Sequence, residues 1–197
     1  MTYYFFILAF FISGCDSKNQ TEKIKNYDAF HTEAMTFVQN KNMNSDFYYL
    51  LDFNIHSGKN RFFVVDLKSK KIIDAAIVTH GSCDVFSNNS TKHEKAKFSN
   101  EENSHCSSIG KYKIGSRDKS SWGIGIKYWL HGLESTNKNA TKRVVVLHSW
   151  SAVSEEEIFP NHSPLSWGCP AVSDTFMTKI DDKLNGIDKP VLMWIIE

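Results

Sequence analysis

The pattern of apolar and polar residues changes near residue 45. Over residues 19–40, apolar side chains recur at the spacing of one helix face, at Ile24, Tyr27, Phe30, Ala34, Phe37 and Val38. After Asp46, short runs rich in β-branched and aromatic residues dominate. The pattern therefore predicts an N-terminal helix that braces the outside of a mainly β core.

Strand signals follow one another along the second part of the chain. Residues 61–66 and 71–79 flank a Lys/Ser turn and predict a hairpin. Further strands are expected over residues 110–115, 123–130, 143–148 and 191–196. A last helix is expected over residues 173–184, with Ser173 as its N-cap and Asn185-Gly186 at its end. The polar stretch 82–108 lacks periodicity and is expected to be a functional loop.

The start of the chain has the character of an export signal. The first fourteen residues carry no charge, and residues 3–12 are almost wholly apolar. This run is shorter than the roughly 20 residues that span a bilayer, which favours a signal peptide. The run ISGC at residues 12–15 resembles a bacterial lipobox, which implies cleavage before Cys15 and lipidation of Cys15. An ordinary secretory signal is the alternative.

Length and charge narrow the classes of protein. The 197 residues suit one ordinary domain, and the net charge of +1 with scattered basic residues does not favour nucleic-acid binding. We expect a signal peptide at 1–14, a lipidated tether with the brace helix at 15–44, and the folded domain at 45–197. Both signal types direct the protein to the cell envelope.

One cysteine and one histidine carry the candidate chemistry. The run SWGCP at residues 166–170 holds Cys169 in a small-residue turn, and His148 ends an apolar strand, with seventeen residues between His148 and Ser166. An imidazole can take the proton of a thiol and so generate the attacking thiolate. Gly168 leaves room for a substrate carbonyl, and the Gly168 and Cys169 N–H groups suit an oxyanion. A buried structural cysteine beside a core histidine is the alternative.

These residues resemble the signature of a known family, the murein L,D-transpeptidase catalytic domains (YkuD-like), in its second branch. Matching runs occur in the same order, HG at 80–81, FSN at 86–88, SSIGKY at 107–112, HGLE at 131–134 and NA at 139–140. The resemblance extends from about Asp52 to the C-terminus. It implies a β-sandwich with an N-terminal helix and a short helix after the catalytic cysteine. Trp167 stands where many members have His or Arg, and Ser149 where many have Gly.

The resemblance implies a cysteine acyl transfer on peptidoglycan. Cys169 would attack the third residue of a stem tetrapeptide and release D-alanine, with His148 as base and the Ser149 carbonyl orienting the imidazole. An amine acceptor would give a 3→3 cross-link. Water as acceptor would give an L,D-carboxypeptidase or endopeptidase. A non-catalytic peptidoglycan-binding lipoprotein is the third hypothesis.

Seven residues are candidates for contact with the stem peptide: Ser166, Trp167, His80, Gly81, Ser107, Ser108 and Tyr112. Other interpretations stay open for several of them. His80 suits a structural turn, the two serines suit loop capping, and Tyr112 suits a strand aromatic in the core.

The remaining thiols allow two interpretations. If Cys15 is lipidated and Cys169 is the nucleophile, Cys83 and Cys106 either pair in an oxidising compartment or remain as two thiols near the cleft. The spacing of His80, Cys83, His105 and Cys106 follows no usual zinc pattern, so no metal or cofactor is expected. The expected partners are stem peptides and, through a lipid on Cys15, an envelope membrane facing the periplasm. A monomer is expected.

Overall fold

A computed structural model of the chain describes residues 25–84 and 91–197. The expected signal peptide, Cys15 and the run at 86–88 lie outside the described residues. Within these ranges the elements are, in order, α1 (Asp28–Asn40), β1 (Phe47–Asp52), β2 (Phe62–Asp66), β3 (Lys71–Ala76), β4 (Gly110–Lys119), β5 (Ile126–Gly132), β6 (Val146–Ser149), β7 (Ala171–Val172), α2 (Asp174–Leu184) and β8 (Leu192–Ile196). Neither of these helices is long and apolar enough to cross a membrane.

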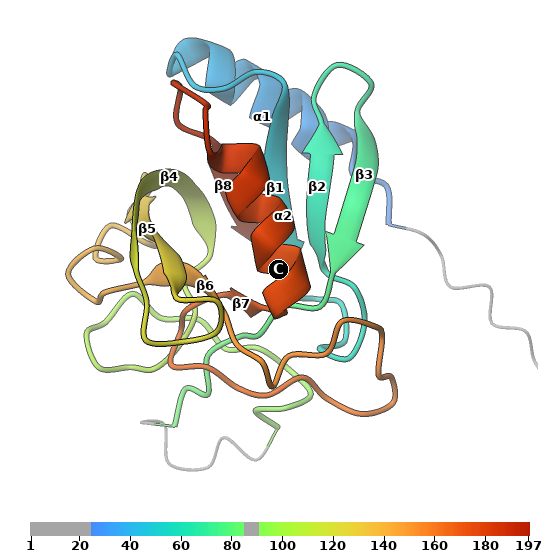
Figure 1. Ribbon diagram of the computed structural model, residues 1–197, viewed down its shortest axis with the longest axis vertical. Coiled ribbons are helices and arrows are strands. Elements are labelled where there is room, and N and C mark those ends of the chain that lie inside the picture. Colours follow the sequence, from blue (N-terminus) through green and yellow to red (C-terminus); the bar gives the residue numbers. More distant parts are fainter. Residues whose placement is uncertain (1–24, 85–90) are drawn as a thin grey trace, which may run out of the picture.

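The strands form one eight-stranded sheet in the order β3-β2-β1-β8-β4-β5-β6-β7. Neighbours are antiparallel except for the β1–β8 and β6–β7 pairs, which are parallel. The sheet curls, so that the β4–β5 and β2–β3 hairpins lie on either side of α2 (Figure 1). The prediction of a mainly β fold with an N-terminal helix and a helix after Cys169 is confirmed, and its layers are made by this one curled sheet.

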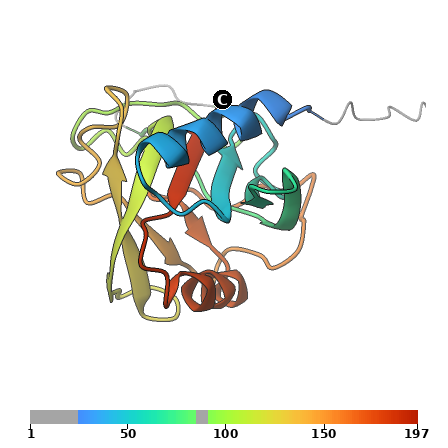
Figure 2. The ribbon, with the colours of Figure 1, turned by 90° about the horizontal axis from the view of Figure 1, so that it is seen from above.

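The two helices cover opposite faces of the sheet (Figure 2). On one face, Ala34 and Val38 of α1 pack against Leu50 of β1 and Trp194 of β8. The start of this helix is tied to the sheet at Asp52, which accepts hydrogen bonds from the Tyr27 hydroxyl at 2.7 Å and the Lys25 ammonium at 2.8 Å. The helix begins at Asp28, and residues 25–27 precede it as irregular chain, so it is shorter than the pattern predicted.

The second helix follows directly on β7 and fills the larger core. Its buried face carries Phe176, Met177 and Ile180. The predicted N-cap is present, because the Ser173 Oγ accepts the Phe176 N–H at 3.3 Å. Two residues of strand and this capped helix therefore hold the chain immediately after Cys169.

Some strands differ from the predicted ranges. β6 begins at Val146 rather than at residue 143, because the preceding residues form a turn in which the Val145 N–H bonds to the Ala140 carbonyl and Val144 has φ +56°. β4 continues past residue 115 to Lys119 through an irregular register with β5. β7 has only two residues, too few to produce a periodic signal.

Candidate active site

The turn that carries Cys169 is held by its own serine and by a neighbouring strand end. The Ser166 hydroxyl donates to the Cys169 carbonyl at 2.6 Å and accepts the Gly168 N–H at 3.1 Å. Thr79 Oγ1 also donates to the Cys169 carbonyl, at 3.2 Å. Gly168 has φ +103°, and a Cβ there would lie 2.5 Å from the Cys106 carbonyl oxygen. Both the backbone angle and the close approach require glycine before the cysteine.

The sulfur of Cys169 lies against the start of β6. The Val146 N–H donates to Sγ at 3.4 Å, and the thiol points to the Val144 carbonyl at 3.7 Å. Burial raises the pKa of the Cys169 thiol, while the Val146 N–H and the Arg143 and Lys127 charges act to lower that pKa. The burial that raises this pKa favours the neutral thiol, which needs a base for attack.

His148, the candidate base, has a defined tautomer. It pairs with Ala171 of β7, and its main-chain N–H donates to the carbonyl of Pro170, the residue directly after Cys169, at 3.4 Å. Its Nδ1 donates to the Ser149 carbonyl at 2.8 Å. A carbonyl only accepts, so Nδ1 carries the proton and Nε2 keeps its lone pair. Burial lowers the pKa of His148, which favours this neutral ring.

Cys169 and His148 open into one cavity of about 420 Å³, lined by Trp122, His148, Trp150, Leu165, Ser166, Trp167 and Cys169. The described walls carry no Lys, Arg, Asp or Glu side chain. Trp122 lies 6.5 Å from the His148 ring and meets Trp150 edge to face at 5.8 Å, both distances between ring centroids. The sequence did not predict the positions of Trp122, Trp150 and Leu165 in the site. The only signal in the sequence was for Trp150, which lies two residues after His148, the spacing of side chains on the same face of a strand.

The two predicted oxyanion donors, the Gly168 and Cys169 N–H groups, differ in whether they already have a hydrogen-bond acceptor. The Gly168 N–H is bonded to the Ser166 hydroxyl, so it is engaged within the turn. The Cys169 N–H has no hydrogen-bond acceptor among the residues that the structure describes. The Cys169 N–H is therefore the donor that is ready for a developing oxyanion.

Of the seven candidate substrate contacts, Ser166 and Trp167 line the cavity, whereas the others do not. The structure favours the structural alternative for His80, because the side chain is buried between Arg61, which donates to its Nδ1 at 2.9 Å, and the Lys92 carbonyl, which accepts from its Nε2 at 2.7 Å. Burial, with the Arg61 charge, lowers the pKa of His80 to about 4. Gly81 is buried under the turn, where a Cβ would lie 2.3 Å from the His105 carbonyl oxygen.

The structure likewise favours the structural alternatives for Ser107, Ser108 and Tyr112. These side chains are at most 3% exposed. Ser107 accepts the Gly81 N–H at 3.1 Å, Ser108 donates to the Ser99 carbonyl at 2.8 Å, and Tyr112 donates to the Ser108 carbonyl at 2.7 Å. They hold the loop that supports the cysteine turn, which is the structural role that the sequence left open for them.

Arg143 is a site residue that the sequence analysis did not single out. Its guanidinium donates to the Cys106 carbonyl at 2.5 Å and to the Ser108 hydroxyl at 2.6 Å, and further to the Ser99 carbonyl and the Ser104 hydroxyl. A Cβ on Gly168 would lie 3.3 Å from its Nη2. One cation therefore connects the 99–108 loop to the back of the cysteine turn.

The structure joins Cys83 to Cys106 in a disulfide, the first of the two alternatives for these thiols. The bond closes the loop whose end, at Cys106, packs on Gly168. Within the described ranges, no group of three or more His, Cys, Asp or Glu side chains is arranged to hold a metal ion.

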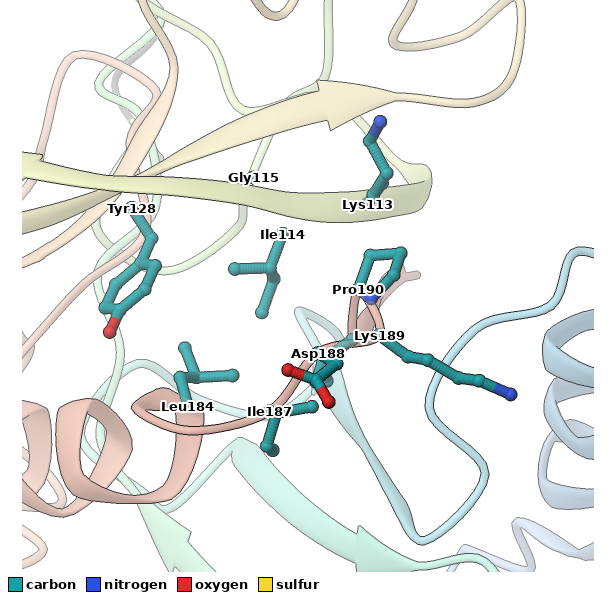
Figure 3. Close-up of a pocket in the computed structure, with 10 residues that line it drawn as sticks. Lys113, Ile114, Gly115, Tyr128, Leu184, Ile187, Asp188, Lys189 and Pro190 are labelled. Carbon is teal, nitrogen blue, oxygen red and sulfur yellow. The ribbon is translucent and has the colours of Figure 1, made fainter.

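A second cavity of about 350 Å³ lies between β4 and the segment after α2 (Figure 3). Its polar lining includes Tyr128, Asp188 and two lysines, Lys113 and Lys189, whose ammonium groups point away from it in Figure 3. It contains neither Cys169 nor His148. The cavity at the Cys169 turn is therefore the candidate active site.

Comparisons with known proteins identify the family of the chain. A family model described as the L,D-transpeptidase catalytic domain matches residues 20–193. No curated protein sequence matches the chain. Similar solved structures include Bd1075 of Bdellovibrio bacteriovorus, with 15% identity and a TM-score of 0.46 over 78% of this chain and 49% of that chain. They also include L,D-transpeptidases of Xylanimonas cellulosilytica DSM 15894, with 11% identity and a TM-score of 0.40 over 82% and 68% of the two chains, and of Mycobacterium smegmatis, with 10% identity and a TM-score of 0.42 over 77% and 59%.

The chain spans about half the length of Bd1075, 49% of it. The family model, in contrast, covers most of this chain and includes both Cys169 and His148. The chain belongs to the family of L,D-transpeptidase catalytic domains.

Proposed function

We propose that this protein is a peptidoglycan L,D-transpeptidase that uses Cys169 as nucleophile and His148 as base. The observation that carries the proposal is that both residues line one cavity, with Nδ1 of His148 bonded to the Ser149 carbonyl and Nε2 left to accept a proton. The family of the chain supports a peptidoglycan-related activity of this type.

The acylation step uses the groups of the turn. Nε2 of His148 takes the thiol proton as Sγ of Cys169 attacks the carbonyl of the third stem residue. The Cys169 N–H donates to the oxygen of the tetrahedral intermediate. The C–N bond to the terminal D-alanine then breaks, and His148 returns the proton to the leaving amine. A thioester to Cys169 remains, and D-alanine is released.

The acceptor decides the outcome of the second step. The amine of a second stem loses a proton to His148, attacks the thioester and displaces Sγ, which gives a 3→3 cross-link and restores the thiol. Water attacking the same thioester would release a tripeptide instead. The walls formed by Trp122, Trp150, Leu165 and Trp167 favour transfer, because apolar walls limit access of water to the thioester.

The test is product analysis with the full chain, purified in detergent, and a disaccharide-tetrapeptide substrate. We expect release of D-alanine and formation of cross-linked dimers, both lost in C169A. A carbapenem adduct that intact mass detects in the wild type and not in C169A would assign the acyl group to Cys169. Tripeptides without dimers would identify a carboxypeptidase. Dimers formed by C169A, or no turnover by the wild type, would refute the proposal.

We also propose that the protein is a monomeric lipoprotein, anchored in an envelope membrane through Cys15 and facing the periplasm. The apolar run at residues 3–12 and the ISGC sequence that ends at Cys15 support this proposal. Mass spectrometry of the N-terminal peptide should find cleavage before Cys15 and a lipid on its sulfur. C15S should remain unlipidated, and an unmodified Cys15 in the wild type would refute the anchor.

A further inference from the structure

Trp167 is more exposed than any other large apolar side chain that the structure describes, at 73%. One face of its indole is covered by the His105 imidazole, with ring centroids 4.6 Å apart and planes 7° apart. His105 Nδ1 in turn donates to the Asp84 carboxylate at 2.6 Å. The indole orientation is therefore fixed by stacking on His105, which is itself fixed by Asp84, while much of the indole surface stays open to a ligand.

The parts of this platform, defined as Trp167, His105 and Asp84, come from segments that are tied together. The Ser82 N–H donates to the Ser166 carbonyl at 2.8 Å, and Gly81 forms a parallel β-bridge with Ser166. The platform residues of the loop, Asp84 and His105, each lie next to one cysteine of the disulfide. An exposed aromatic side chain held rigid in this way is preorganised for a ligand.

The chemistry of the platform selects a flat ligand with an apolar face. The cavity beside it is walled by aromatic and aliphatic side chains, and its described walls carry no Lys, Arg, Asp or Glu. A pyranose ring has such a face, formed by its axial C–H groups, and an indole is the side chain that offers it the largest flat area. The carboxylate of the platform, Asp84, is bonded to His105, so the open surface that Trp167 offers a ligand is the apolar indole.

We propose that the platform is a subsite for a pyranose ring, namely the amino sugar that carries the stem peptide of the substrate. This inference rests on the proposed function. The reach is suitable, since Trp167 is two residues, at most about 7 Å, from Cys169, and its indole extends further. In an extended stem, the sugar lies about 10 Å from the third residue's carbonyl, because three residues span that distance.

The test compares two ligands that differ only in the sugar. The full chain with C169A is titrated with disaccharide-tetrapeptide and with free tetrapeptide, and binding is measured by calorimetry. We expect the disaccharide form to bind about tenfold tighter, the range of one good aromatic stack. In C169A/W167A the two affinities should become equal. H105A, added to C169A, should reduce the difference by loosening the indole without removing it.

Phe159 provides the matched control. It is a second exposed aromatic side chain, 56% exposed, that also contacts a histidine, His56, at 5.0 Å between centroids, and it lines a different cavity. C169A/F159A should keep the tenfold difference. Circular dichroism and thermal melting of each variant show that it is folded.

Two results would overturn the subsite. One is equal binding of the two ligands to C169A, and the other is an equal loss for both ligands in C169A/W167A, which would assign Trp167 to the peptide. The outcome does not depend on turnover. If the wild type released no D-alanine from either ligand, the proposed function would fail, while the binding ratio would still decide the subsite.

Discussion

The Ser149 carbonyl accepts a hydrogen bond from Nδ1 of His148 at 2.8 Å, while the hydroxyl of the same serine accepts one from the Ile124 N–H at 2.9 Å. The two functions of Ser149 are thus separated between its main chain and its side chain. The main chain orients the base, and the side chain holds the loop with Gly123, whose Cβ would lie 1.9 Å from the Ser149 Oγ.

S149A is therefore expected to lower stability more than activity. Loss of the Oγ leaves the Ile124 N–H without its partner, which should cost about 1 kcal/mol in the free energy of unfolding, measured by urea denaturation. The carbonyl remains, so kcat/KM should stay within roughly threefold of wild type. A loss in S149A as large as that in H148A would show that the hydroxyl takes part in catalysis.

The pH dependence of Cys169 alkylation should report a neutral Cys–His pair. Burial raises the pKa of the Cys169 thiol and lowers the pKa of His148, so both groups are neutral near pH 7. The rate of iodoacetamide alkylation should rise with pH, with a midpoint above the ordinary thiol value of about 8.5. Transpeptidation should fall only below about pH 6.5, where His148 becomes protonated and cannot take the thiol proton.

Peptide mass spectrometry measures this alkylation at Cys169, and C169A gives the background. A thiolate already formed at pH 6, with a midpoint below that pH, would indicate a thiolate–imidazolium pair at rest. That result would contradict the neutral pair.

Arg143 should affect both the stability of the loop and the ionisation of the nucleophile. R143Q removes hydrogen bonds to four groups of the 99–108 loop and should cost about 2–4 kcal/mol of unfolding free energy. Since the Arg143 charge lowers the pKa of the Cys169 thiol, R143Q should also move the alkylation midpoint to higher pH.

R143K serves as the control, because it keeps the charge and loses the planar set of donors. It should be destabilised while its alkylation midpoint stays near that of the wild type. Equal midpoints for R143Q and the wild type would show that the charge does not act on the sulfur.

The disulfide should stabilise the domain and the site together. It joins residues 23 positions apart, and closing a loop of this size is worth about 3 kcal/mol. Reduction should therefore shift the urea midpoint downwards, and kcat/KM should fall, because the Cys106 carbonyl supports Gly168. The variant C83A/C106A should be insensitive to the reductant. Identical urea curves with and without the reductant would refute this stabilisation.

The local chemistry of the chain was readable from the sequence. Ser173 as N-cap, the helix that follows it and most of the strands depend on short-range periodicity and on side chains near in sequence. The small-residue turn at Gly168 and the strand that ends near His148 are also local features. They were sufficient to indicate a Cys–His site and its family.

Whether several side chains point into the core or toward the cleft could be determined only from the tertiary structure. His80, Ser107 and Tyr112 were candidates for the cleft, and all are buried. Alternation along a strand separates two faces, but it identifies the core face only where the other face is solvated. His80 and Ser107 lie outside the named strands, where no alternation applies, and Tyr112 lies in β4, whose first three residues are all buried, so the pattern carried no such information.

The sequence by itself thus determined the fold class and the capped helix, and it identified Cys169 and His148 as the candidate catalytic pair. Only the tertiary structure decided that Trp122, Trp150 and Trp167 meet around that pair, that Arg143 supports the turn from behind, and that β8 lies between β1 and β4. The physical reason is that these contacts join segments distant in the chain. Their geometry follows from the packing of the whole sheet, which no short stretch of residues encodes.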